Sequence, residues 1–440
     1  MSRLPLLVLG TLLMAPTCDP APEPNAGPTS DEPSTAQPKK ISTDPQLEEE
    51  LALKPSKPPA KEVDPQRPAE LPDKGIWPEL DAAVWLAAPL GVDSASTSIV
   101  VDKQHRVLTL LAGGVPLVSY PIALGFAPQG DKLESGDGRT PEGSYYICEL
   151  LDRGLATKYG ARSIRLSYPN SKDAERGAAA GTISETQRRA IDEAIAARGM
   201  PPQNTVLGSS IRIHGGGIAG DWTAGCVALR DDDVIDLFGL VQNSTAVRLL
   251  GDGEKPPFGD RDADGIPDAI DLLLGAKKTV LNGSEYDGKY VKIPHTGGDV
   301  PREIGVCTDV IVRALRNAGL DLQVEVQADR NRRPKAFPRM KEPNPSIDHR
   351  RVKNLSPWFA RHWTSHPTGD FADYRPGDVI LMDTLPAEGP DHIGIISDRL
   401  GESGKPLVIN NWTVGHTTAE MDLLDWVEVT HRYRWGRGER

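Results

Sequence analysis

The sequence lacks an excess of basic charge, and its cysteines are few and scattered. Its 50 lysines and arginines are outnumbered by 62 aspartates and glutamates, which gives a formal net charge of -12. A nucleic-acid partner is therefore not expected, because phosphate contacts require a basic face. The four cysteines form no Cys-x-x-Cys pair. Their spacing predicts neither a zinc site nor a disulfide framework.

Long apolar runs are also missing, so no membrane helix is predicted. The apolar run at residues 4–14 follows Arg3 and is too short to span a bilayer stably. This pattern predicts that residues 1–18 are an export signal and that the protein reaches the periplasm or cell envelope. Cys18 directly after the run indicates a lipoprotein signal, in which a lipidated Cys18 tethers the protein to a membrane. The alternative is ordinary cleavage nearby and a soluble product, because Pro16 departs from the small residues usual before such a cysteine.

Residues 19–76 are rich in Pro, Ser, Thr, Glu and Lys. Such a segment buries too little apolar surface to offset the entropy of ordering it, so a disordered, partly extended tether is predicted. A chain of 440 residues is too long for one ordinary domain. Two folded domains after this tether are expected.

Residues 77–252 have the pattern of a β-rich domain with few helices. Short apolar runs between polar or glycine turns predict strands at 98–102, 106–111, 115–122, 143–148, 163–167, 210–213 and 246–250. Ser184 and Gln187 form a capping-box pattern, which predicts a helix that ends near residue 199. A second helix is expected at 231–240.

A histidine and a cysteine in a glycine-rich stretch form the first candidate site. His214 ends a predicted strand, and Cys226 follows twelve residues later. A cysteine is a nucleophile only as the thiolate, so it needs a base or a positive neighbour. The intervening glycines allow the loop to fold back and bring the imidazole toward the sulfur. An isolated pair of this kind is more often a buried cysteine and a packing histidine.

The surrounding residues resemble the catalytic motif of the YkuD-type L,D-transpeptidases. Thr223-Ala-Gly-Cys-Val227 matches the Ser/Thr-x-Gly-Cys-Ile/Val segment of that family, and residues 138–143 resemble its Thr-Pro-x-Gly turn. The resemblance implies that Cys226 is the nucleophile, that His214 is the general base and acid, and that Gly225 with the adjacent backbone stabilises the oxyanion. Ala224 and Ala228 depart from the histidine and arginine that many members have there.

The family resemblance implies acyl transfer on the stem peptides of peptidoglycan, with no cofactor for catalysis. A Cys thioester would be passed to an amine, which gives cross-linking or anchoring. The alternatives are an L,D-carboxypeptidase or endopeptidase that passes the thioester to water, and an inactive wall-binding protein. Arginine binds carboxylates bidentately. The predicted substrate-binding residues are Arg139, Arg165, Arg212, Trp222 and Thr223.

Residues 253–278 form an acidic junction with a regular carboxylate spacing. Alternate carboxylates around a turn glycine suit a hard cation. The run resembles the calcium-binding repeats of thrombospondin type 3, and a structural calcium that stiffens the junction is predicted. The expected ligands are Asp260, Asp262, Asp264, Asp268, Asp271 and the Ile266 carbonyl. The alternative is an acidic, solvated linker.

Residues 279–440 predict an α+β domain, in which a helix at 307–318 precedes strands at 378–382, 392–397 and 406–410. Cys307 begins the helix, where the helix dipole favours a thiolate. The order of elements resembles the NlpC-like clan of papain-like cysteine peptidases. This resemblance implies Cys307 as nucleophile, His392 as base and Asn410 as orienting residue, with Asn411 as second choice. The alternative is a structural cysteine and a core histidine. The fold class expected is therefore multi-domain, with a β-rich YkuD-like domain and an α+β papain-like domain.

Overall fold

The computed structural model describes residues 84–85, 93–337, 340, 342–385 and 389–436. The expected export signal, the Pro-rich tether and Cys18 lie outside these residues. Within the described part of the chain, no helix has both the length and the apolar composition needed to cross a membrane. The described residues contain two sheet-based domains joined by a junction, and each domain is described by itself.

The first domain is built on one sheet, to which nine strands of the described chain belong, in the order β1-β4-β3-β2-β9-β5-β6-β7-β8. The pairs β2–β9 and β7–β8 are parallel, and the other neighbours are antiparallel. This agrees with the β-rich domain that the short apolar runs between turns predict. The strands are β1 Val84–Trp85, β2 Thr97–Asp102, β3 Val107–Ala112, β4 Val115–Pro121, β5 Gly143–Leu151, β6 Ser163–Leu166, β7 Arg212–His214, β8 Val227–Ala228 and β9 Ala246–Leu249.

The apolar core of this domain lies between the sheet and α3 (Asp231–Leu240), whose Val234, Leu237 and Leu240 are buried in it. Three acidic residues in the first turn of α3 favour a helix start at this point. The 3-10 helices η1 (Ser94–Ser96) and η2 (Thr157–Tyr159) complete the domain's connections.

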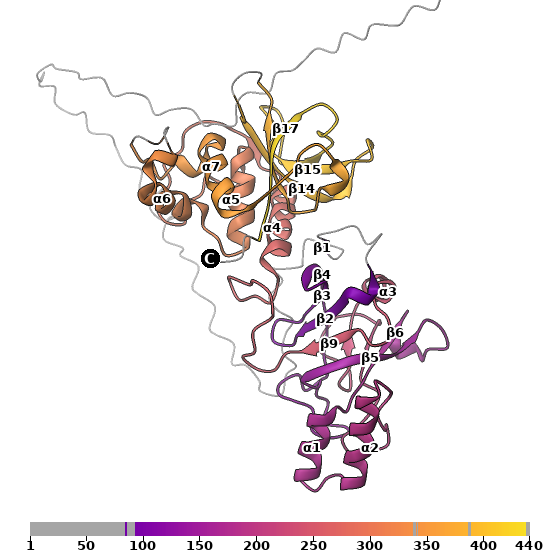
Figure 1. Cartoon of the computed structure of the whole chain (residues 1–440). Helices are drawn as coiled ribbons and strands as arrows, with labels where there is room; N and C mark the ends of the chain where they lie inside the picture. The colour runs from indigo at the N-terminus through magenta and orange to yellow at the C-terminus, as the bar shows by residue number, and fades with distance from the viewer. Residues whose placement is uncertain (1–83, 86–92, 338–339, 341, 386–388, 437–440) are drawn as a thin grey trace, which may run out of the picture. The chain divides into compact units, whose positions relative to one another are not determined.

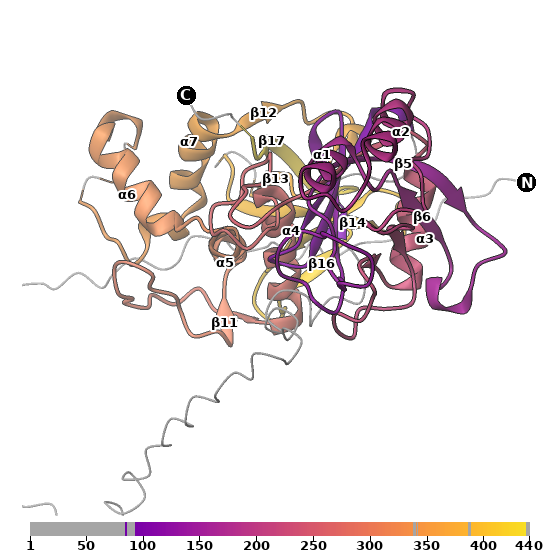
Figure 2. The same cartoon turned by 90° about the horizontal axis from the view of Figure 1, so that it is seen from below.

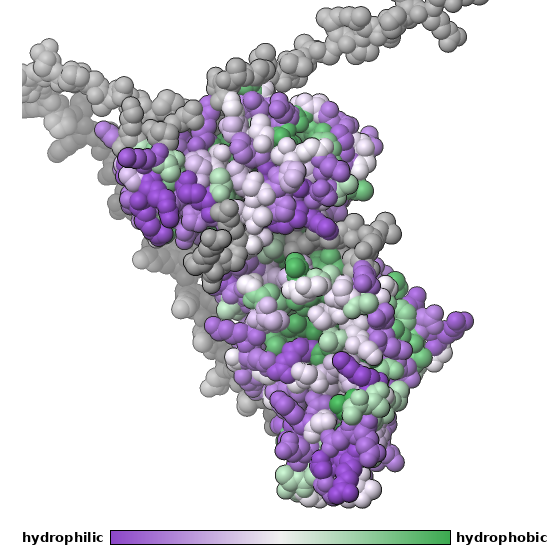
Figure 3. Space-filling model, viewed as in Figure 1, coloured by the Kyte–Doolittle hydropathy of each residue, from purple (hydrophilic) through white to green (hydrophobic). Residues whose placement is uncertain are grey.

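A helical pair, α1 (Ser171–Ala179) and α2 (Glu185–Ala196), projects from the same domain. The predicted capping box at Ser184 and Gln187 is confirmed, whereas α1 was not predicted. The two helices lie side by side in both views (Figures 1 and 2). Their own small core is formed by Ala174, Ile183, Ile191 and Leu207. The face of the pair seen in Figure 3 is mostly hydrophilic, as expected for helices with one narrow buried side.

The second domain contains a six-stranded antiparallel sheet in the order β12-β17-β13-β14-β15-β16. The first four residues of strand β13, Val-Ile-Leu-Met, are all apolar and all buried. A continuous apolar run of this kind is expected in a strand that is covered on both faces. Val379 and Leu381 pack in one apolar cluster, and Ile380 and Met382 pack in another. The strands are β12 Thr364–His366, β13 Val379–Asp383, β14 His392–Leu400, β15 Pro406–Asn410, β16 Ala419–Met421 and β17 Glu428–Arg434, and β10 Glu285–Tyr286 pairs with β11 Ile304–Gly305.

Helices cover one face of this sheet, and three of them were not predicted. The predicted helix at 307–318 is confirmed as α5, Cys307–Asn317, and ends before Gly319 at φ 69°. The expected linker 253–278 is wrong in its second half, because residues from Asp268 onward are helical. Their apolar side chains are buried in the core, which favours a helix over a solvated linker. The other elements are α4 Asp268–Asn282, α6 Leu322–Arg332, α7 Val352–His362, η3 Pro334–Ala336, η4 Asp348–Arg350 and η5 Phe371–Asp373.

Candidate active site

The loop before Cys226 is fixed by a buried aspartate. Asp221 Oδ1 accepts a hydrogen bond from the Leu124 backbone N–H at 2.8 Å, and its Oδ2 accepts from Arg106 Nη2 at 2.8 Å. Because the Asp221 carboxylate is almost fully buried, its charge is balanced by the Arg106 guanidinium and by the backbone dipole. This contact, which was not predicted from the sequence, holds the loop against Leu124, in the segment that follows β4.

Thr223 closes a tight turn around the cysteine. Its hydroxyl donates to the Cys226 carbonyl at 2.7 Å and accepts from the Gly225 N–H at 3.1 Å. Thr223 was predicted to bind substrate, and in this structure it holds the cysteine backbone instead. The Gly225 N–H, which was expected to be an oxyanion donor, is already bonded to the Thr223 hydroxyl. An oxyanion role for that N–H would require this bond to be given up.

Gly225 is in a conformation and a position that exclude a side chain. Its φ is +124°, a region that L-residues rarely adopt, and a Cβ there would lie 2.5 Å from the Arg139 backbone oxygen. The predicted Thr-Pro-x-Gly turn lies on the same side, because the Thr140 hydroxyl accepts from the Gly125 N–H at 2.9 Å. The two family motifs are therefore in contact, although they are far apart in sequence.

Cys226 is a free, part-buried cysteine. Its thiol donates to the Ser210 carbonyl at 3.7 Å, so the sulfur lies against the start of β7. Burial raises the pKa of the Cys226 thiol, and the opposing effects of the Arg212 backbone N–H and of the positive charges on Arg212, Lys158 and Lys132 do not offset it. The thiol is therefore protonated at neutral pH in this state.

His214 ends strand β7 and has one tautomer fixed by the backbone. Its Nδ1 lies 2.6 Å from the Gly215 carbonyl oxygen. Because a carbonyl only accepts, Nδ1 carries the proton and Nε2 has the free lone pair of a base. Burial lowers the pKa of His214, so the ring is neutral at pH 7. The rings of Tyr159 and Trp222 contact the imidazole edge to face, at centroid distances of 5.1 and 5.6 Å.

The expected direct bond between the thiol and the imidazole is not present. Strands β7 and β8 are parallel, with Ile213 opposite Val227 and His214 opposite Ala228. The sulfur lies beside the first part of β7, whereas the imidazole is at its last residue. Within the described chain, the thiol's hydrogen-bond partner is Ser210 rather than His214. The sequence predicted that the two residues share one neighbourhood, and it could not predict this offset along the strand.

Two of the three arginines predicted to hold a substrate carboxylate are engaged with Glu149. Arg212 Nη2 lies 2.8 Å and Arg165 Nε lies 3.2 Å from Glu149 Oε2. Arg212 is nearly fully buried, which makes this pair structural. Arg139 forms no ion pair within the described residues, and its Nη1 makes only a long 3.4 Å contact with the Asp131 carbonyl. Arg139 is therefore the member of the predicted set that is available to a ligand.

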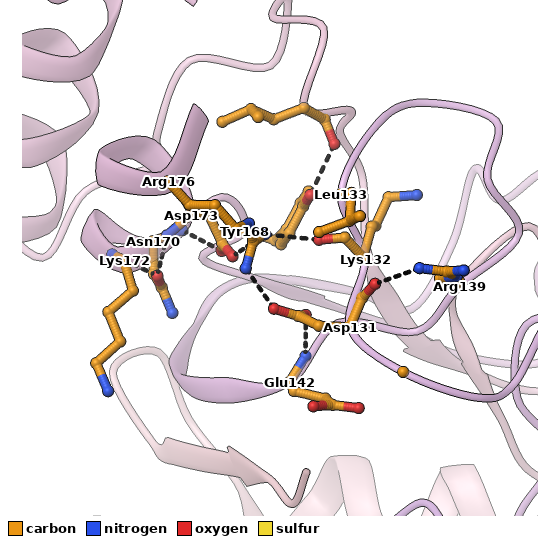
Figure 4. A network of polar contacts seen from close by, with 12 residues as sticks. Asp131, Lys132, Leu133, Arg139, Glu142, Tyr168, Asn170, Lys172, Asp173 and Arg176 are labelled. Carbon is orange, nitrogen blue, oxygen red and sulfur yellow. Dashed lines mark hydrogen bonds and ion pairs between the residues drawn. The ribbon is translucent and has the colours of Figure 1, made fainter. Parts of the chain in front are cut away.

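The loop that carries Arg139 is anchored on helix α1 (Figure 4). The Asp131 carboxylate accepts the Glu142 N–H at 2.8 Å and pairs with Arg176 of α1. Arg176 also donates to the Lys132 carbonyl at 2.7 Å. The unpredicted helix α1 thus holds the loop whose backbone lies against Gly225. No motif in the sequence indicates this long-range contact.

In the second domain, the structure brings His392 and Asn410 together. His392 Nε2 lies 3.2 Å from Asn410 Oδ1, on neighbouring strands β14 and β15. Burial lowers the pKa of His392 to about 4, and the Asn410 bond opposes this only in part. The second choice, Asn411, donates instead to the Ser284 and Gly305 carbonyls at 3.1 and 3.2 Å. The geometry favours Asn410 as the orienting residue.

Cys307 is the first residue of α5, as predicted, but it is disulfide-bonded. No disulfide was expected from the sequence, because spacing along the chain does not reveal pairs between distant cysteines. The sulfur of Cys307 is therefore not available as a nucleophile in the state described. Cys307, His392 and Asn410 are all fully buried.

The predicted cation ligands divide between a loop and a helix. Carboxylate oxygens of Asp260, Asp262 and Asp264 all lie within 4.8 Å of one another. Asp268 and Asp271 lie in the first turn of α4. The Ile266 N–H donates to Asp264 Oδ1 at 2.9 Å, and its predicted carbonyl ligand stays a prediction.

Comparison with known families identifies the first domain. Residues 96–249 match the family described as the L,D-transpeptidase catalytic domain, YkuD, and residues 273–435 match a domain of unknown function, DUF1287. The Escherichia coli (strain K12) protein called Uncharacterized protein YijF is 41% identical over 166 residues, which are 37% of this chain and 78% of that protein. The chain belongs to the YijF family.

The match of residues 96–249 confirms the YkuD-type domain that the sequence predicted, and its action on peptidoglycan stays a prediction. The papain-like assignment of the second domain stays a prediction. Similar solved structures include Bd1075 of Bdellovibrio bacteriovorus, with 21% identity, coverage of 38% of this chain and 52% of that chain, and a TM-score of 0.25. Pgp2, a helical cell shape determining protein of Campylobacter jejuni, has 19% identity, 46% and 63% coverage, and a TM-score of 0.27. L,D-transpeptidase 1 of Mycobacterium tuberculosis has 13% identity, coverage of 36% of this chain and 62% of that chain, and a TM-score of 0.21. The chain thus spans between about half and two thirds of these three structures.

Proposed function

We propose that the first domain is a cysteine-dependent L,D-transpeptidase that acts on the stem peptides of peptidoglycan. The observation that carries this proposal is the free thiol of Cys226, held by the Thr223 turn against strand β7. The far end of that strand presents His214 as a neutral base, with its lone pair on Nε2. We place the activity in the periplasm or cell envelope.

Acylation begins when the Cys226 thiol turns from the Ser210 carbonyl toward His214 and gives its proton to Nε2. The thiolate then attacks the carbonyl carbon of the L-centred third residue of the stem, and a C–S bond forms. As the tetrahedral oxyanion collapses, the C–N bond to the terminal D-amino acid breaks. The departing nitrogen takes the proton from His214, and Arg139 is the candidate to hold a carboxylate of the stem peptide.

Deacylation reverses these roles. An acceptor amine attacks the thioester carbonyl and gives its proton to His214, after which the C–S bond breaks and the sulfur takes the proton back. Water at the same position would give hydrolysis by an L,D-carboxypeptidase or endopeptidase. Trp222 is 41% exposed, and its ring contacts the imidazole of His214 edge to face. We therefore propose that Trp222 lines the side of the site from which the acceptor approaches.

A product assay separates transfer from the two alternatives. Purified protein is incubated with tetrapeptide-stem muropeptides, and the products are resolved by mass. We expect new dimers or amine adducts, which form when the thioester passes to an amine. Trimmed monomers without dimers would indicate a hydrolase, and unchanged substrate that co-sediments with the protein would indicate a wall-binding protein.

We also propose that the second domain is an NlpC-like cysteine peptidase that is inactive until Cys307 is reduced. The bond between His392 and Asn410, and the position of Cys307 at the start of α5, support this proposal. The same product assay tests it when a reductant is added. Trimmed monomers that persist in Cys226→Ala and disappear in Cys307→Ala would support the second activity, and their absence with reductant present would contradict it.

The pH dependence of Cys226 alkylation tests the resting protonation state. Because burial raises the pKa of the thiol, the thiolate becomes populated only at higher pH than for an ordinary cysteine. An ordinary cysteine has a pKa of about 8.5, and the pKa of Cys226 is raised above the usual range. We therefore expect the rate of alkylation by iodoacetamide to keep rising as the pH passes about 8.5. The rate is measured by peptide mapping in a Cys148→Ala background. A plateau already below pH 7 would indicate a thiolate–imidazolium pair instead.

A further inference from the structure

We propose that residues 260–271 bind one calcium ion, which joins the loop 260–266 to the first turn of helix α4. This segment lies between the two family matches, which end at residue 249 and begin again at residue 273. The inference therefore concerns a part of the chain that neither domain family covers, and it does not depend on the transpeptidase activity.

The loop presents three carboxylates to one point. Oxygens of Asp260, Asp262 and Asp264 lie within 4.8 Å of one another, and each of these side chains is at least partly open to solvent. The Asp260 carboxylate accepts the N–H groups of Asp264 and Gly265 at 3.1 and 3.0 Å. Three carboxylates this close repel one another unless a cation lies between them.

A buried and incompletely bonded carboxylate adds an independent indication of a ligand. The Asp271 side chain is only 1% exposed, and its Oδ2 has no hydrogen-bond partner among the described residues. Its other oxygen accepts from Asn317 Nδ2. A buried anionic oxygen without a partner is costly, so such atoms normally have a donor or a metal ion. A cation in this position would supply the missing partner of Oδ2.

The loop is hydrogen-bonded to the helix start that carries Asp271, because the Gly259 carbonyl accepts from the Asp268 N–H at 2.9 Å. Asp268 differs from Asp271 and from the three loop carboxylates, because its oxygens contact the Arg261 backbone N–H at 2.9 Å and Arg261 Nε at 3.6 Å. We therefore assign Asp260, Asp262, Asp264 and Asp271 as ligands and Asp268 as a residue that orients the loop.

The donor set selects the kind of cation. All four side chains offer oxygen, with no histidine or cysteine among them, which disfavours zinc and other transition metals. Calcium accepts six to eight oxygens at variable angles, whereas magnesium demands a regular octahedron. Carboxylates from an irregular loop and a helix suit calcium better. Since the ion would bind only the folded junction, it would stabilise that junction by mass action.

Calorimetric titration of the full chain, stripped with EDTA, tests the proposal. We expect saturable binding of one calcium ion with a micromolar to submillimolar Kd, a rise in Tm with calcium, and weaker binding of magnesium. Asp262→Asn and Asp264→Asn should each weaken calcium binding at least about tenfold. Asp252→Asn makes the same charge change at an exposed position directly before the junction and should leave binding unchanged.

Asp271→Asn distinguishes a ligand from a merely structural residue. Because it removes an unbonded buried charge, we expect the calcium-free variant to melt at the same temperature as the wild type or higher, while the response of Tm to calcium is lost. A lower Tm without calcium together with an intact calcium response would overturn the role of Asp271. Absence of saturable calcium binding to the wild type, or equal binding by Asp264→Asn, would overturn the site.

Discussion

Replacing Cys226 with alanine is expected to abolish formation of every product of the first domain. Because the thiol is the group that we propose forms the acyl intermediate, the loss of transfer rate should be at least about 10³-fold. The fold should be unaffected, because the hydrogen bond that the thiol donates, to the Ser210 carbonyl at 3.7 Å, is long and weak. The initial rate of dimer formation and the Tm of the variant provide the measurement.

Cys148→Ala is the matched control for this substitution. Cys148 is also a free, part-buried cysteine of the same domain, and its thiol donates to a backbone carbonyl, that of Arg165, at 3.6 Å. We expect this variant to retain the transfer rate of the wild type. Equal loss in both variants would mean that the effect comes from packing, and retained transfer in Cys226→Ala would exclude Cys226 as the nucleophile.

Gly225→Ala is expected to have the second largest effect, on both stability and transfer. The new Cβ would lie 2.5 Å from the Arg139 backbone oxygen and would force an L-residue into φ +124°. Backbone strain of this kind costs about 1–3 kcal/mol. Since the clash displaces the turn that carries Cys226, transfer should fall about 10²-fold. Urea unfolding of the first domain and the rate of dimer formation measure the two effects.

Substitutions at two other glycines of the same loop distinguish the effect of backbone strain from the effect of a steric clash. Gly217 has φ +100°, and a methyl group added there would have no atom within 4 Å, so Gly217→Ala tests strain alone. Gly220 has neither constraint, and Gly220→Ala should resemble the wild type. If Gly225→Ala matches Gly220→Ala in stability and rate, the close approach to Arg139 does not position the cysteine.

The β-rich part of the first domain could be predicted because its strands follow a local pattern. Apolar runs between glycine and polar turns placed strands β2 to β6 and β9 within a few residues. Helix α2 was predicted from its capping box of Ser184 and Gln187, whereas α1 was missed because its capping box uses Asn170 and Asp173 in place of the Ser/Thr and Glu/Gln of the usual pattern. Helix α4 was missed because its first turn is acidic, and this signal was interpreted as a linker rather than as charge near a helix start.

The site residues could be predicted where a short sequence motif contains them. They could not be predicted where contacts between distant segments determine the position or the partner of a side chain. Cys226 and His214 were found from the motif, but the register of β7 and β8 that offsets them is a property of the sheet. The ion pairs of Arg165 and Arg212 with Glu149 join distant segments, so no spacing rule indicates them. The anchoring of the 131–142 loop on Arg176 was missed for the same reason.

The thioester intermediate is the most direct test of the central claim, that Cys226 is acylated by a stem peptide. Protein is mixed with a tetrapeptide-stem muropeptide in the absence of an added amine, quenched in acid and analysed by intact mass and peptide mapping. The account predicts a mass increase equal to the mass of the muropeptide minus that of the released D-amino acid, located on Cys226 and removed by hydroxylamine. Product formation without any adduct on Cys226, or an adduct located on another residue, would contradict it.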